Sequence, residues 1–266
     1  MAPVPPDTVI VGLLVGDLVP HALQLIGVGP GDPELLTIAA VRAIETADVV
    51  AYPVARTDVD GMAWTIASRW TRSTQRRLPL VFPMVAEAEP RLKAWRHAAD
   101  SLASELRRGL SVVLLCEGDA SLFASSSYVQ LALRKQHPDL RVKLIPGIPA
   151  VCAAAAACAE MEIDWPLALQ QEGVLIRPCP DRVSDLERLL ESAESSSMVL
   201  ALIKLGQRWP WVRTCLDQRQ LLEGSLFAQR VGWPDQVLAR ATEIPAESKP
   251  YFSLLLIRQT WPEVLP

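Results

Sequence analysis

The chain has 266 residues, half of them hydrophobic, and its 26 basic and 30 acidic side chains give a formal net charge of −4. This length can bury one large or two smaller cores, and the composition excludes collagen-like, disulfide-scaffold and fully disordered proteins. The slight acidity argues against a dedicated nucleic-acid-binding protein, which usually carries a clustered basic excess.

The cysteines and histidines show no spacing typical of metal ligands, so we predict no metal site. The N-terminal segment lacks a basic leader. The longest uncharged stretch, residues 144–159, is interrupted by two prolines and is shorter than the roughly 18 apolar residues of a membrane span. We therefore expect a cytoplasmic protein with reduced thiols and no membrane partner.

Short, continuous runs of Val, Leu and Ile recur along the chain, a pattern typical of strands that are buried on both faces of a sheet. The predicted strands are 23–28, 49–52, 112–116, 142–145, 198–203, 226–228 and 254–257. The predicted helices are 33–47, 91–108, 125–135, 150–159 and 185–194. Asp32 is the expected N-cap of the first helix, and Gly109 is expected to end the second. This alternation of strands and helices predicts an α/β fold.

The organisation along the chain predicts three parts. Residues 1–22 form an N-terminal arm, residues 23–147 a first α/β domain, and residues 148–266 a linker helix with a second α/β domain. The alanine run at 153–157 allows two interpretations, which can both hold: a helix packed closely on a sheet through small side chains, or bare backbone that a ligand approaches.

Turn-rich, partly charged segments follow five of the predicted strands. They are Gly29–Pro33, Glu117–Asp119, Pro146–Pro149, Lys204–Gly206 and Arg230–Gly232. Because ligands of parallel sheets bind outside the carboxyl ends of the strands, we expect one cleft shared by the two halves. The glycines at 27, 29 and 31 resemble a dinucleotide fingerprint only weakly, since the third comes one residue early and Pro30 removes an amide. A plain strand-to-helix turn is the alternative interpretation.

One motif carries a more specific resemblance. The segment Gly27-Val-Gly-Pro-Gly-Asp-Pro-Glu-Leu-Leu-Thr37, continuing to Pro53, resembles the opening motif of the tetrapyrrole (corrin and porphyrin) methylases, which use S-adenosylmethionine. The similarity extends through Cys116–Asp119, Ile145–Ile148 and Tyr251–Arg258. Within the family, the chain is most similar to the branch that methylates C20 of precorrin-2 at Phe82–Met84, Glu117 before Gly118-Asp119, Lys204–Gly206 and Arg230 with Pro234-Asp235.

The resemblance implies a homodimer whose subunit has two αβα domains with mostly parallel sheets and an active-site cleft between them. It implies methyl transfer from S-adenosylmethionine to precorrin-2 or its cobalt-loaded form in corrinoid (vitamin B12) synthesis. Carried over by motif, the residues expected to bind the methyl donor are Pro30, Gly118, Asp119, Leu122, Pro149, Ala150, Ile203, Lys204 and Val231. Those expected to bind the tetrapyrrole are Gly29, Gly31 and Arg230.

Asp32 and Glu117 are the candidate catalytic carboxylates, able to accept the released proton or to stabilise positive charge on the macrocycle. For Asp32 the alternative is helix capping alone. Glu117 directly follows a buried strand, so it should face the cleft or find a partner, because unpaired desolvation is costly. Lys204 has a solvated strand end as its alternative, whereas Phe82 and Met84 are expected to serve core or dimer packing.

A cluster of arginines is expected to form a solvated basic face, with a rim for a substrate rich in carboxylates as the alternative. Its members are Arg56, Arg69, Arg72, Arg76 and Arg77. The chain also departs from the family pattern at Ala120, Phe123 and Pro149, which stand where a proline, a tyrosine and a serine are common. Besides the C20 activity, two alternatives follow: a tetrapyrrole methylase acting at a different ring position or on another acceptor, and a tetrapyrrole-binding protein without catalysis.

Overall fold

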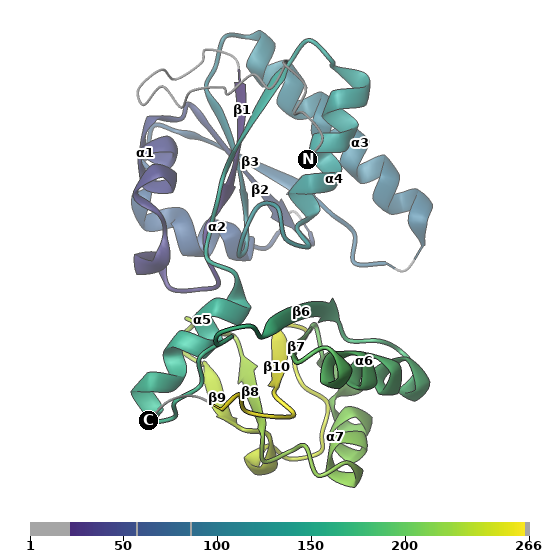
Figure 1. Ribbon diagram of the computed structural model, residues 1–266. Coiled ribbons are helices and arrows are strands. Elements are labelled where there is room, and N and C mark those ends of the chain that lie inside the picture. Colours follow the sequence, from purple (N-terminus) through teal and green to yellow (C-terminus); the bar gives the residue numbers. More distant parts are fainter. Residues whose placement is uncertain (1–21, 57, 86, 264–266) are drawn as a thin grey trace, which may run out of the picture.

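The computed structural model describes residues 22–56, 58–85 and 87–263, which form two stacked α/β halves (Figure 1). The first half contains β1 (Ala22–Gly27), η1 (Pro33–Leu35), α1 (Ile38–Thr46), β2 (Val49–Val54), α2 (Met62–Ala67), η2 (Ser68–Trp70), β3 (Arg76–Val81), α3 (Ala88–Arg107), β4 (Val112–Cys116), α4 (Ser125–Gln136) and β5 (Arg141–Ile145). The second contains α5 (Ala150–Ala157), η3 (Cys158–Met161), β6 (Gly173–Pro178), α6 (Val183–Ser195), β7 (Met198–Ile203), η4 (Gly206–Arg208), α7 (Trp209–Gln218), β8 (Ser225–Gln229), β9 (Val237–Arg240), η5 (Ala241–Glu243) and β10 (Ser253–Ile257). The predicted arm lies outside the described residues, except for Ala22 in β1.

The first half is a parallel sheet covered by helices on both faces. Its strand order is β3-β2-β4-β1-β5, and every neighbouring pair is parallel. Because side chains alternate along a strand, Val112, Leu114 and Cys116 of β4 pack with α3 and α4. Val113 and Leu115 pack with α1 and α2 on the other face. Burial on both faces explains why β4 is continuously apolar in sequence, as the prediction assumed.

The second half also has a five-stranded sheet, in the order β6-β7-β10-β8-β9. Only β6 and β7 pair in parallel, whereas the other three pairs are antiparallel. The expectation of mostly parallel sheets is therefore correct for the first half and wrong for the second. The connection from β8 to β9, residues 230–236, is too short for the crossover that parallel neighbours need. Helices α6 and α7 cover one face of this sheet, and α5 covers the other.

The predicted helix over residues 33–47 is wrong at its centre. Residues Leu36 and Thr37 are extended and separate the short η1 from α1. The Oδ1 atom of Asp32 accepts a hydrogen bond from the Glu34 N–H at 2.8 Å and caps η1 only. Thr37 is the true N-cap of α1, since its Oγ1 atom accepts a hydrogen bond from the Ala40 N–H at 3.1 Å. The predicted helix over residues 150–159 is two residues too long, because the observed α-helix, α5, ends at residue 157.

The end of α3 follows the prediction. Its last helical residue is Arg107, and Gly109 adopts a φ of +78° just beyond the helix. The Gly109 N–H donates to the Leu106 carbonyl at 3.0 Å, which satisfies a carbonyl group near the helix end. A glycine suits this left-handed position because it has no Cβ atom. None of the helices within the described ranges combines the length and apolar character needed to cross a bilayer.

Candidate active site

Four glycine backbones meet at the carboxyl edge of the first sheet. Gly29 and Gly118 form an antiparallel bridge through hydrogen bonds of 3.2 and 2.7 Å between their backbone groups. A Cβ atom on Gly27 would lie 2.6 Å from the Gly118 carbonyl oxygen, and one on Gly147 only 2.2 Å from it. The loops after β1, β4 and β5 can approach this closely because these positions lack side chains. This packing fixes the loop 117–119 at the end of the first half.

The loops after β7 and β8 form the facing edge of the second half. Both strands run antiparallel to β10, which lies between them, so they run in the same direction and end at the same edge. Lys204 and Arg230 follow these strands with φ angles of +61° and +49°. Such angles are unfavourable for residues with a Cβ atom and are concentrated at functional sites in proteins. The local backbone therefore holds both cationic residues in strained positions.

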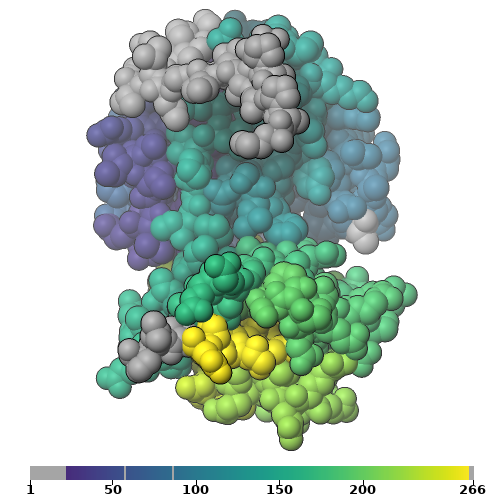
Figure 2. Space-filling model, viewed as in Figure 1, coloured from purple at the N-terminus to yellow at the C-terminus, as the bar shows by residue number. Residues whose placement is uncertain are grey.

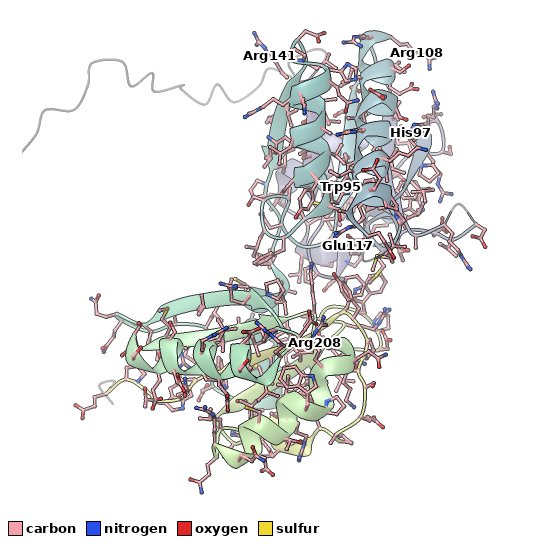
Figure 3. All side chains as sticks on the ribbon, turned by 90° about the vertical axis from the view of Figure 1, so that its right-hand side faces the viewer. Trp95, His97, Arg108, Glu117, Arg141 and Arg208 are labelled. Carbon is pink, nitrogen blue, oxygen red and sulfur yellow. The ribbon has the colours of Figure 1, made fainter. Side chains whose placement is uncertain are left out.

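A cavity of about 450 Å³ lies between these two edges. All nine residues predicted to bind the methyl donor line it: Pro30, Gly118, Asp119, Leu122, Pro149, Ala150, Ile203, Lys204 and Val231. Glu117 and Arg230 line it as well. Figure 3 places Glu117 at the end of the first half that faces the second, and Figure 2 shows the two halves meeting at a narrower waist. The structure brings these residues together, and their individual roles stay predictions.

Three other predicted site residues, Gly29, Gly31 and Asp32, do not line this cavity. Gly29 pairs with Gly118, and a Cβ atom on Gly31 would lie 2.4 Å from Cδ1 of Trp233. The hydrogen bond of the Asp32 carboxylate caps η1, so the geometry favours capping over catalysis for this residue. Gly31 therefore allows the close approach of Trp233, whereas Gly29 suits its position because its φ of +78° is unfavourable for residues with a Cβ atom.

Glu117 and Asp119, two of the acidic residues that line the cavity, have opposite electrostatic environments. Burial raises the pKa of the half-buried Glu117 carboxyl, although hydrogen bonds from its own N–H and from the Ala63 N–H oppose the effect. Partial burial also acts to raise the pKa of Asp119. Hydrogen bonds from Ser121 and from the Gly147 N–H, the latter at 2.9 Å, outweigh it and lower that pKa. Asp119 is thus held ionised, whereas burial favours the protonated form of the Glu117 carboxyl.

Apolar side chains form much of the remaining cavity lining. Phe82 packs against the first core and also reaches the cavity. Met84 is 74% exposed and Phe123, with a φ of +52°, is 45% exposed, and both line the cavity. The expectation that Phe82 and Met84 serve packing is thus incomplete. From the second half come Tyr251 and Phe252, which precede β10. These surfaces can cover the flat face of an aromatic or macrocyclic ligand.

Sequence reasoning did not single out Trp233, Tyr251 or Phe252 as cavity residues. Trp233 belongs to a Gly-Trp-Pro turn directly after a predicted strand, and that position was a usable signal. Tyr251 and Phe252 come before β10, so they could not be found by looking only at the residues that follow each strand. Tyr251 also faces Lys204, whose Nζ lies 5.6 Å from the ring centroid. Lys204 therefore contributes to the cavity wall and is more than a solvated strand end.

The arginine cluster forms a charge-balanced surface. Its cationic groups pair with neighbouring acids or carbonyl groups: Arg56 with Asp58, Arg69 with Glu34, Arg72 with the Ala47 carbonyl, Arg76 with Glu105, and Arg77 with Asp60. None of these five arginines lines the cavity, which favours the solvated face over the substrate rim.

The alanine run packs into the second half, where Ala153 and Ala154 are buried against the sheet. Only the start of α5, at Ala150 and Val151, reaches the cavity. Within residues 22–56, 58–85 and 87–263, no group of three or more His, Cys, Asp or Glu side chains is placed to hold a metal ion.

The two stacked α/β halves and the cavity between their facing edges define a two-domain α/β protein with a ligand site between its domains. Comparison with known sequences identifies the family. The chain belongs to the tetrapyrrole (corrin/porphyrin) methylases, whose family pattern it matches over residues 22–244.

Two relatives illustrate the similarity. The chain is 31% identical over 240 residues to the cobalamin biosynthesis protein CobIJ of Mycobacterium bovis, covering 87% of this chain and 45% of that relative. The chain thus spans about half the length of this relative. It is 27% identical to the cobalt-precorrin-2 C(20)-methyltransferase of Salmonella typhimurium, with 90% of this chain and 97% of that relative covered.

Solved structures share the fold. A cobalt precorrin-4 methyltransferase superposes with a TM-score of 0.65 at 21% identity, covering 91% of this chain and 98% of the other. The uroporphyrin-III C-methyltransferase of Thermus thermophilus, complexed with S-adenosylhomocysteine, gives a TM-score of 0.58 at 20% identity, covering 90% and 92%. At these identities the likeness concerns the fold alone.

Proposed function

We propose that this chain is a methyltransferase that moves a methyl group from S-adenosylmethionine to C20 of precorrin-2, or of its cobalt-loaded form, in corrinoid biosynthesis. The observation that carries the proposal is the shared cavity, which gathers all nine residues predicted to hold the methyl donor. The relative in Salmonella typhimurium, named for this C20 transfer and similar over nearly its whole length, supports the ring position.

The cavity suits the proposed donor in shape and charge. Its volume falls within the range of small-molecule sites. Gly118 lines it with a φ of +67°, and a Cβ atom built there would meet no atom within 4 Å, so this backbone is open to a ligand. The ionised Asp119 supplies a negative charge that complements a positively charged sulfonium group. We assign the donor to the floor formed by the loop 117–119, with the loops after β7 and β8 closing over it.

The proposed reaction is a direct displacement. The C20 carbon attacks the methyl carbon, the bond from sulfur to methyl breaks, and sulfur keeps the electron pair, which leaves S-adenosylhomocysteine. The reaction needs alignment of three atoms and exclusion of water, and oriented approach alone can contribute roughly 7–11 kcal/mol. Glu117 accepts the proton that the methylated ring carbon releases. Its burial favours this role, because a base works best with a pKa near the operating pH.

The direct test is to incubate the purified chain with precorrin-2 and methyl-labelled S-adenosylmethionine. A product carrying one additional methyl group at C20, located by NMR, is expected. Its absence would refute the proposal. Glu117→Gln should lower the transfer rate by roughly 100-fold or more while retaining S-adenosylhomocysteine binding. The matched control Glu45→Gln changes an exposed carboxylate on α1 and should retain the wild-type rate.

A second candidate is transfer to a different ring position. It is favoured by similarity to the cobalt-precorrin-4 C(11)-methyltransferase of Priestia megaterium, 26% identical over 83% of this chain and 78% of that relative. The labelled product distinguishes the two positions. Binding of the tetrapyrrole without any affinity for the methyl donor would instead indicate a non-catalytic binding protein. We also propose that the chain forms a homodimer, which light scattering on the purified protein tests.

A further inference from the structure

We propose that Trp233 is a positioning residue that clasps the two halves together and thereby sets the width of the cavity. The inference rests on the proposed function for its donor-binding consequence, whereas the clasp itself is a property of the structure. The Nε1–H group of Trp233, in the second half, donates a hydrogen bond to the Pro30 carbonyl, in the first half, at 2.9 Å. Both residues line the cavity, so this bond joins two of its walls.

Two glycines allow the halves to approach at this point. The Trp233 ring lies against Gly31, where a Cβ atom would come within 2.4 Å of Cδ1 and 2.6 Å of Nε1. On the other side, a Cβ atom on Gly232 would lie 2.6 Å from the backbone nitrogen of Asp32. The segment between β1 and α1, purple in Figure 1, accordingly lies at the end of the first half nearest the second. Gly31 and Gly232 are therefore required by the contact between the halves.

The packing is reciprocal. Trp233 packs against the core cluster of the first half that contains Ile26 and Val28. Leu35 of the first half packs against the core cluster of the second that contains Val231. Each half thus inserts one apolar side chain into the other, beside the hydrogen bond to Pro30. An arrangement of this kind resists sliding as well as separation, because both inserted side chains must leave apolar surroundings together.

Interactions within the loop 230–236 hold Trp233 in place. The Arg230 guanidinium lies 4.7 Å from the centroid of the Trp233 ring, and its Nε atom lies 2.7 Å from Oδ1 of Asp235. The Gly232 N–H donates to Oε1 of Gln236 at 2.7 Å, and the Trp233 N–H donates to the Arg230 carbonyl at 3.0 Å. The indole is thereby held in one orientation before any ligand binds. A preorganised clasp lowers the ordering cost of closing the cavity around a donor.

The test compares Trp233→Phe with Trp211→Phe, the same substitution on α7, where the side chain packs against the second core. The phenyl ring retains apolar packing but cannot donate to Pro30. Hydrogen–deuterium exchange without ligand should show faster exchange in residues 29–36 for Trp233→Phe, by roughly fivefold, the equilibrium worth of one neutral hydrogen bond. Trp211→Phe should leave these residues at the wild-type rate. Asp235→Asn, which loosens Arg230 at the exposed surface, should give a smaller increase in the same segment.

Calorimetry with S-adenosylhomocysteine provides the second measurement. Trp233→Phe should weaken binding by up to about fivefold, with an unfolding midpoint lowered no more than that of Trp211→Phe. Unchanged exchange in residues 29–36 would overturn the proposed contact, and unchanged affinity would overturn its effect on donor binding. If the wild-type chain itself fails to bind S-adenosylhomocysteine, the proposed function fails, while the exchange experiment still decides whether Trp233 joins the halves.

Discussion

Substitution of Gly147 by alanine tests whether the close contact of the Gly27, Gly118 and Gly147 backbones sets the floor of the cavity. The added Cβ atom would lie 2.2 Å from the Gly118 carbonyl oxygen and 2.6 Å from the Gly27 carbonyl carbon. The first distance falls short of an ordinary 3.4 Å contact by about 1.2 Å, and both neighbours are backbone atoms that cannot rotate away. The loop 117–119 must therefore move by about 1 Å, which also disturbs the hydrogen bond from the Gly147 N–H to Asp119.

We expect Gly147→Ala to lower the free energy of unfolding by about 1–3 kcal/mol, the usual cost of overpacking. A displacement of this size at a reacting centre can lower the transfer rate by on the order of 100-fold. Urea unfolding and single-turnover transfer measure the two effects. Gly173→Ala is the matched control, because its Cβ atom would meet only the Met198 side chain, which can move. Wild-type transfer by a folded Gly147→Ala variant would refute the reasoning.

Three further changes probe the cavity and the core. Because burial raises the pKa of Glu117, ionisation of this carboxyl opposes folding as the pH rises above the ordinary glutamate value of 4.5. Glu117→Gln should therefore gain stability relative to the wild type as the pH rises above that value, and a stability difference in urea unfolding that does not change with pH would contradict the burial effect. Arg258→Met leaves the buried Glu172 without its cation and should cost about 3–5 kcal/mol in the same assay, whereas a loss below about 1 kcal/mol would show that the pair is dispensable. Lys204→Gly relieves the strain of a φ of +61°, because glycine adopts this angle readily, and should raise the free energy of unfolding by about 1 kcal/mol. The same substitution should weaken S-adenosylhomocysteine binding, and unchanged affinity in calorimetry would exclude Lys204 from the donor site.

The strands that the sequence predicted are mainly those buried on both faces, because continuous apolar runs identify such strands. The predictions 112–116 and 198–203 match β4 and β7 to the residue. The three missed strands, β3, β6 and β9, are all at sheet edges. β3 begins with Arg76 and Arg77 and contains Pro79, a composition that an edge strand tolerates and a central strand does not. Edge strands bury less surface, so their apolar pattern is weaker.

The short helices α2 and α7 were also missed. α2 has only six residues, which is too short to show a helical period. α7 begins at Trp209 with a proline next to it, and a proline in the first turn is easily taken for a break. The division of the predicted first helix at Leu36 and Thr37 was missed for a related reason, because the apolar spacing continues across the interruption.

The candidate site could be located in large part from the sequence, since the loops after β1, β4, β7 and β8 converge as expected. Motif resemblance gave the residues predicted to bind the donor, and the structure gathers them around one cavity. Residues that depend on how the halves meet could not be found in this way. Trp233 acquires its role only through contact with Pro30 and Gly31, which are distant in the chain. The predicted catalytic role of Asp32 stays a prediction, although its Oδ1 atom caps η1 and the residue does not line the cavity.

The central position of β10 has a consequence for biosynthesis. β7 and β8 are bonded through β10 and not to each other, so the second sheet stays divided into two ribbons until residues 253–257 have emerged from the ribosome. The first sheet, complete at residue 145, can assemble well before that, as domains generally fold in order of their synthesis. Until β10 is added, the edges of β7 and β8 that face it carry unpaired backbone N–H and C=O groups, which are open to pairing with other strands.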